Sequence, residues 1–217
     1  MNLLKRRAVV LGLSLVLPLA SPGHSEADGD RGAWSKVPAL TVVASENDPR
    51  LPLVREAVEY WNKCFAEMGT PFRLGTVARV SGTVALADLR LLSSSGPVIF
   101  PDSVHRLPGD IIVALSEGDL VSFSVRWPEH RKALVGIKTQ RRYPLTLPNV
   151  TRNVIAHELG HAIGLERHND DPTMLMCGRP APCRPDMFAS ATKRYFPLTK
   201  EEEAWLLELY PPGWKGH

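Results

Sequence analysis

Residues 157–176 read HELGHAIGLERHNDDPTMLM, with two histidines four positions apart and a glutamate directly after the first. Residues four apart on a helix differ by about 40° around the axis and about 6 Å along it, so His157 and His161 can direct two imidazoles at one metal ion. Glu158 lies at the flank of that face, within reach of a water on the metal. Apolar residues take the opposite side: Ile155, Leu159, Ala162 and Ile163. The pattern predicts a helix with a buried back and a metal-binding front.

This set of residue types is suited to a zinc ion that activates water. A zinc with three protein ligands keeps one position open for water, and binding lowers the pKa of that water from about 16 to about 7. Glu158 would take up the proton while the water attacks a peptide carbonyl, and would then pass it to the leaving nitrogen. A five-residue His-Glu-x-x-His pattern also arises by chance on surface helices, so the residues after it are needed to identify the chemistry.

The residues after this pattern provide for a third ligand. Gly164 permits a left-handed turn at the helix end, after which the chain can reverse toward the metal. His168 offers a third imidazole, and zinc also accepts carboxylate oxygens, so Asp170 and Asp171 are competing ligands. Arg167 cannot coordinate because its guanidinium stays protonated. From ligand chemistry alone, three candidates stay open.

With these residues the stretch resembles the metzincin clan of zinc peptidases, and within it the matrixin-type catalytic domains. HELGHAIGL matches their active-site helix, His168 their third histidine, and Met176 the methionine of their Met-turn, an apolar floor beneath the histidines. The resemblance implies one catalytic Zn²⁺ held by His157, His161 and His168, with Glu158 as general base. It implies a protein or peptide substrate and leaves a calcium requirement open.

The sequence departs from the matrixin pattern at two places. The family has its third histidine three residues after the glycine, where this chain has Arg167, and His168 comes one residue later. His168 precedes Met176 by eight residues, as in matrixin-type domains, so the resemblance places the extra residue between Gly164 and His168. Cys177 stands where the family usually has tyrosine, so any role of that tyrosine is not carried over.

Two rival interpretations remain beside a zinc endopeptidase. One is a non-catalytic zinc-binding relative that serves as an interaction module. A purely structural site would not need Glu158 and would usually be closed by a fourth protein ligand. The other is a zinc enzyme of the same clan whose third ligand is a glutamate on a later helix, against which Gly164, His168 and Met176 argue.

The first 27 residues predict a secretory signal peptide. Lys5, Arg6 and Arg7 precede an apolar run over residues 8–17, which is shorter than the roughly 20 residues of a membrane-spanning helix. Cleavage is possible after Ala20 or after Ala27. The expected location is therefore periplasmic or secreted.

Without those three basic residues, the 26 Lys and Arg of the chain fall to 23, equal to the 23 Asp and Glu. No basic stripe then remains for a nucleic acid or an anionic membrane surface, and neither is expected as a partner. The oligomeric state is left open. Of three cysteines, Cys177 and Cys183 close the short loop CGRPAPC and are expected to form a disulfide. Cys64 falls on the apolar face of a predicted helix and is expected to be a buried thiol.

Apolar periodicity and turn residues predict the remaining elements. A strand is expected at 39–44 and an amphipathic helix at 51–68. Strand-like segments follow at 72–77, 84–92, 110–115, 119–126 and 133–139. The metal-motif helix is expected from about Asn149 to Leu165. A last helix follows Thr199, whose spacing to Glu202 is that of a capping box, and Pro211 stops it.

These elements predict one α+β domain over residues 34–217. It would have a mixed twisted sheet, an N-terminal helix, a central active-site helix and a C-terminal helix. The resemblance implies that this is a metzincin-like peptidase fold.

Overall fold

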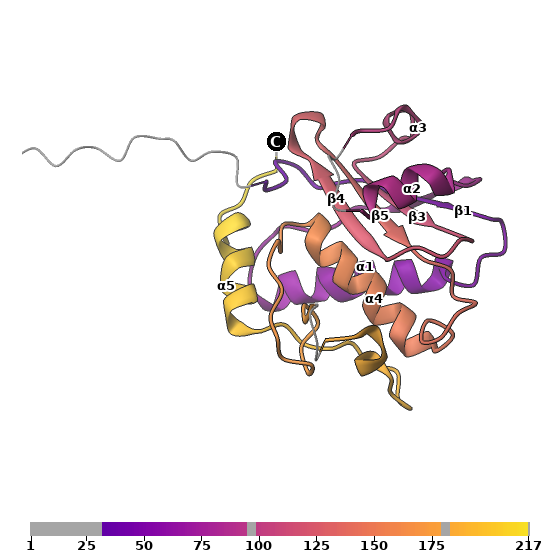
Figure 1. The fold of residues 1–217 in the computed structure, drawn as a ribbon. Coiled ribbons are helices and arrows are strands. Elements are labelled where there is room, and N and C mark those ends of the chain that lie inside the picture. The colour runs from indigo at the N-terminus through magenta and orange to yellow at the C-terminus, as the bar shows by residue number, and fades with distance from the viewer. Residues whose placement is uncertain (1–31, 95–98, 179–182, 217) are drawn as a thin grey trace, which may run out of the picture.

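The computed structural model describes residues 32–94, 99–178 and 183–216 (Figure 1). The predicted leader, residues 1–27, lies outside the described residues. Within the described ranges, no helix has both the length and the apolar character needed to cross a membrane.

Five strands form one sheet in the order β2-β1-β3-β5-β4. β1 pairs in parallel with β2 and β3, β3 pairs in parallel with β5, and β4 is antiparallel to β5. The strands are β1 (Leu40–Ala44), β2 (Val77–Ser81), β3 (Ile111–Leu115), β4 (Phe123–Trp127) and β5 (Lys132–Ile137). All residues of β1 and β3 are buried, as expected for central strands covered on both faces. The predicted α+β class with a mixed sheet is confirmed.

Helices cover both faces of this sheet (Figure 1). α1 (Leu51–Glu67) and α4 (Pro148–Ala162) pack together on one face and enclose the larger apolar core. The Trp61 indole of α1 donates a hydrogen bond to the Ala156 carbonyl of α4 at 2.9 Å. The opposite face carries a smaller core with α2 (Leu86–Leu92) and α3 (Asp102–His105). α5 (Lys200–Leu209) follows the short 3₁₀ turn Pro185–Phe188, and another 3₁₀ turn, Pro128–His130, joins β4 to β5.

Four predictions for the elements were wrong, one of them the start of segment 119–126, since β4 begins only at Phe123. Segment 84–92 is largely the helix α2, because Leu86, Leu89 and Leu92 recur every three residues and face inward. Segment 72–77 contributes only its last residue to a strand, since β2 begins at Val77. The metal-motif helix ends at Ala162 rather than Leu165. α3 and its position were not predicted at all.

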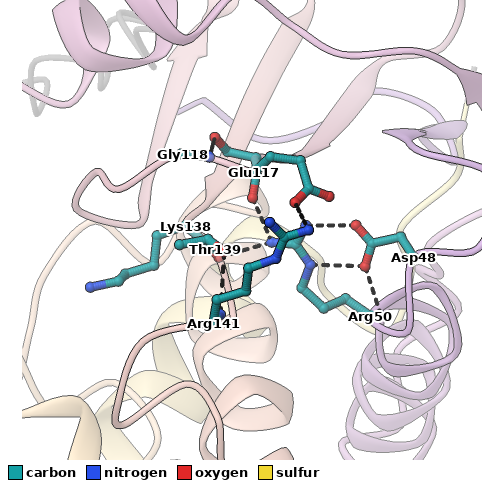
Figure 2. Close-up of polar contacts among 8 residues, drawn as sticks. Asp48, Arg50, Glu117, Gly118, Lys138, Thr139 and Arg141 are labelled. Atoms are coloured by element: carbon teal, nitrogen blue, oxygen red, sulfur yellow. Dashed lines mark hydrogen bonds and ion pairs between the residues drawn. The ribbon is translucent and has the colours of Figure 1, made fainter.

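A buried ion pair fixes the loop that enters α4 (Figure 2). Arg50, 2% exposed, binds both carboxylate oxygens of Asp48 at 2.9 and 2.6 Å. Its guanidinium also donates to the carbonyls of Ser116 and Lys138, each at 2.9 Å, and so joins the carboxyl ends of β3 and β5. Two further contacts join the segment after β5 to the segment after β3. The Thr139 N–H donates a hydrogen bond to the Gly118 carbonyl, and Arg141 forms an ion pair with Glu117. The segment of residues 138–141, which follows β5 and leads toward α4, is therefore attached to the segment that follows β3.

Candidate metal centre

His157, His161 and His168 come together at the carboxyl-terminal half of α4. The Nε2 atom of His157 lies 3.2 Å from that of His161 and 3.2 Å from that of His168, and the remaining pair is 2.9 Å apart. Zinc–nitrogen bonds of about 2.0–2.1 Å at tetrahedral angles place ligand nitrogens about 3.3 Å apart. The three nitrogens therefore fit a single metal ion, and among the described residues they form the one His/Cys/Asp/Glu group close enough to hold one.

The second ring nitrogen of two histidines fixes their orientation. His157 Nδ1 lies 2.7 Å from the Leu175 carbonyl, and His161 Nδ1 contacts the Leu165 carbonyl. Because a carbonyl oxygen only accepts, each Nδ1 must carry the proton. Each Nε2 is then left with a lone pair directed at the shared point, which is the tautomer that a metal ligand needs.

Burial keeps these imidazoles neutral. Removal from water, together with the neighbouring histidines, lowers the pKa of His157 to about 3 and that of His161 to about 4. Burial also lowers the pKa of His168, although this residue is the most exposed of the three. Neutral imidazoles are the form that binds metal, so no protonation has to be reversed near neutral pH.

Glu158 lies beside the histidines with no partner of its own. It is 8% exposed, and no hydrogen bond or ion pair joins its carboxylate to any residue in the described ranges. Burial raises the pKa of Glu158 to about 8. A cation at the histidines would counteract that rise. The carboxylate oxygens are not among the described side-chain atoms that are fully buried without a partner, so they keep some contact with solvent and can exchange a proton with water.

Met176 packs against the helix at Gly160. Met176 is fully buried, and a Cβ built on Gly160 would lie 2.6 Å from its sulfur. Only glycine therefore allows the sulfur to approach the helix between the two histidines. The preceding residue, Leu175, supplies the carbonyl that orients His157. This is the place at which the resemblance puts the Met-turn.

Gly164 makes the turn that the sequence predicted. Its φ is +112°, and a Cβ there would lie 2.6 Å from Leu209. The turn explains why α4 ends early, and the carbonyls at its end are taken by three aromatic donors. Trp34 binds Ala162 O, Tyr210 binds Ile163 O and Trp205 binds Gly164 O, at 2.9, 2.8 and 2.9 Å. These hydrogen bonds satisfy carbonyl groups that the end of α4 leaves without a partner inside the helix.

The rival third ligands lie elsewhere. Asp171 accepts hydrogen bonds from the backbone and hydroxyl of Thr173 at 2.8 and 2.7 Å, in a local turn. Neither Asp171 nor Asp170 belongs to the metal-binding group. Glu202, the buried glutamate of the later helix α5, binds Asn169 and is also outside that group. The arrangement therefore favours His168.

The predicted disulfide between Cys177 and Cys183 is present, with Cα atoms 5.4 Å apart. It follows Met176 directly. Cys64 is free, but the prediction that it is buried was wrong, because it is only partly buried. Its partial burial raises the pKa of its thiol to about 11.

Sequence reasoning missed the residues that support His168. A Cβ on Gly178 would lie 2.0 Å from the His168 ring, and the neighbouring Asn169 binds Glu202 at 2.6 Å. Glu202 was identified only as part of a capping box, which the structure does contain. A close approach of backbone to ring leaves no periodic signal in sequence.

Neither known protein families nor characterised proteins show a match to this chain. The centre is therefore interpreted from its own geometry.

Proposed function

We propose that this protein is an exported zinc endopeptidase with a metzincin-like, matrixin-type catalytic domain over residues 34–217. The observation that carries the proposal is the meeting of three histidine Nε2 atoms at distances that suit one metal ion, with Glu158 directly after the first of these histidines on the same helix. His168 is exposed, so the point where the nitrogens meet is open to solvent on its side. An open position is what separates a catalytic zinc from a structural one.

The chain's own residues would divide the work as follows. When bound, zinc supplies a Lewis acid that makes water acidic enough to ionise near neutral pH and that polarises a carbonyl. His157, His161 and His168 hold the ion as neutral ligands. Glu158 takes the proton of the attacking water and delivers it to the leaving amine nitrogen, so one carboxylate serves as base and then as acid.

The substrate would lie along β4. β5 has neighbours on both sides, whereas β4 pairs only with β5 and lies at the edge of the described sheet. β4 also contacts α4, the helix of His157 and His161. An extended peptide can add to such an edge through backbone hydrogen bonds. A substrate bound in this way would run alongside β4, close to the helix that carries His157 and His161.

A non-catalytic zinc module is disfavoured by Glu158. Such a module gains nothing from a buried carboxylate without a partner, and that carboxylate costs stability in the folded state. Export is supported by the Cys177–Cys183 disulfide, which persists in oxidising compartments, together with the leader-like residues 1–27.

The test is to incubate the mature protein with a mixed peptide library, with and without a zinc chelator, and to map cut sites by mass spectrometry. The proposal predicts internal cleavages that disappear with chelator and return when zinc is restored. Zinc binding at one ion per chain without any cleavage would instead identify the interaction module. Cleavage unaffected by chelator would refute zinc catalysis.

A further inference from the structure

The loop that carries His168 is attached to helix α5 on both of its sides. After His168, the Asn169 side-chain amide donates to Glu202 at 2.6 Å. Before His168, the Trp205 indole donates to the Gly164 carbonyl at 2.9 Å. The Arg167 guanidinium also lies over the Trp205 ring, 6.0 Å from its centroid. One helix therefore holds the loop where it leaves α4 and again directly after the third histidine.

Glu202 uses its two carboxylate oxygens for different purposes. Oε2 accepts the Thr199 backbone N–H at 2.8 Å and completes the capping box of α5, in which Thr199 accepts the Glu202 N–H at 3.1 Å. Oε1 is occupied by Asn169. Glu202 is 8% exposed, so both contacts are shielded from water. Capping α5 needs only the first oxygen, and the second is directed at the loop.

Asn169, which binds Glu202, also forms hydrogen bonds with the backbone around His168. Its backbone N–H donates to the Met176 carbonyl at 3.1 Å, and its carbonyl accepts the Gly178 N–H at 3.1 Å. Its side-chain oxygen accepts the Asp171 N–H at 2.9 Å. The His168 ring lies directly against Gly178. Fixing the Asn169 amide therefore fixes the backbone that determines where the His168 ring can lie.

This attachment matters for His168 more than for the other two histidines. His157 and His161 are fixed by the rigid helix α4, whereas His168 lies in an irregular, exposed loop with Glu166 and Arg167. Holding each loop residue in one conformation costs backbone entropy. Contacts from α5 offset that cost before a metal arrives. Outer residues that orient a metal ligand typically change metal affinity about 10- to 100-fold when lost.

We propose that Glu202, acting through Asn169, and Trp205 are positioning residues that hold His168 in place for the metal. The inference rests on the proposed role of His168 as a ligand. It adds that the C-terminal helix is part of the metal centre although it supplies no ligand.

The positioning role of the Asn169–Glu202 hydrogen bond is tested by exchanging its donor and its acceptor. Glu202→Gln keeps an oxygen for the capping box but turns an NH₂ group toward the Asn169 NH₂ group, so the contact is lost. Asn169→Asp brings two carboxylates together and loses it as well. The double variant places a donor on Gln and an acceptor on Asp, which restores the contact with its direction reversed. Glu203→Gln is the matched control, because Glu203 pairs with Lys200 on the outer side of the same helix.

The readouts are the zinc dissociation constant, from competition with a chromogenic chelator, and the unfolding free energy of the metal-free protein. Both single variants should weaken zinc binding about 10- to 100-fold, and the double variant should recover to within about threefold of the parent. Trp205→Phe should also weaken zinc binding, and Glu203→Gln should match the parent. The absorption spectrum of the Co²⁺-loaded protein should change in the single variants and return in the double variant.

Parent-like zinc affinity in both single variants would overturn the inference, even if their metal-free unfolding free energy falls, because the contacts would then support only the fold. Weak binding in the double variant equal to that of the single variants would overturn it too. A parent protein that binds no zinc would instead refute the proposed function, and this inference with it.

Discussion

Alanine at Gly178 should displace the third histidine without altering any ligand. A Cβ on Gly178 would lie 2.0 Å from His168 Cγ and 2.4 Å from both Cδ2 and Nδ1. Carbon atoms in contact are normally about 3.5–4.0 Å apart, so the ring and the backbone must separate by about 1.5 Å. Metal–ligand distances tolerate only about 0.2 Å. His168 therefore cannot keep its place beside the other two Nε2 atoms.

We expect Gly178→Ala to weaken zinc binding at least about 10-fold, and up to about 100-fold, by loss of support for one ligand. The dissociation constant is measured by chelator competition, and circular dichroism of the metal-free protein checks that the fold is kept. Gly213→Ala is the control, because a Cβ there meets nothing within 4 Å. A folded Gly178→Ala variant with parent-like zinc affinity would refute the packing of the His168 ring against Gly178.

Three further predictions concern a ligand, a buried ion pair and a thiol. His168→Ala should lose most of the zinc affinity, while Asp170→Ala and Asp171→Ala keep it; an aspartate variant that alone loses zinc would show an oxygen ligand. Arg50→Met should lower the unfolding free energy by about 3–5 kcal/mol in denaturant titrations, because it leaves a buried carboxylate unpaired; a change below about 1 kcal/mol would contradict this. Burial raises the pKa of Cys64 from 9.0 to about 11, so its contribution to stability is present below pH 9 and is lost as the pH rises toward 11. Over that range the parent should lose more unfolding free energy than Cys64→Ala, and parallel pH curves would count against it.

The parts of the site that follow from local sequence were predictable. His157, Glu158 and His161 share one helix, so their spacing alone places them together. The Cys177–Cys183 pairing follows from a short ring, and the central strands β1, β3 and β5 follow from apolar runs between turn residues.

The parts that depend on tertiary pairing were not predictable. The position of β4 at the sheet edge depends on which strands pair, which no single segment records. α2 was taken for a strand because a short apolar segment fits either period until its packing partners are known. The contact of Glu202 with Asn169 joins residues 33 positions apart, and its sequence signal indicated only a helix start.

The central claim is that Glu158 moves the proton while three histidines hold the zinc. It is tested most directly by measuring zinc content and peptide-cleavage rate together in the parent and in Glu158→Gln. We predict close to one zinc per chain in both proteins, and a turnover lower by about 10²–10⁴ in the variant, the usual contribution of a general base. Unchanged turnover, or loss of zinc along with turnover, would contradict the account.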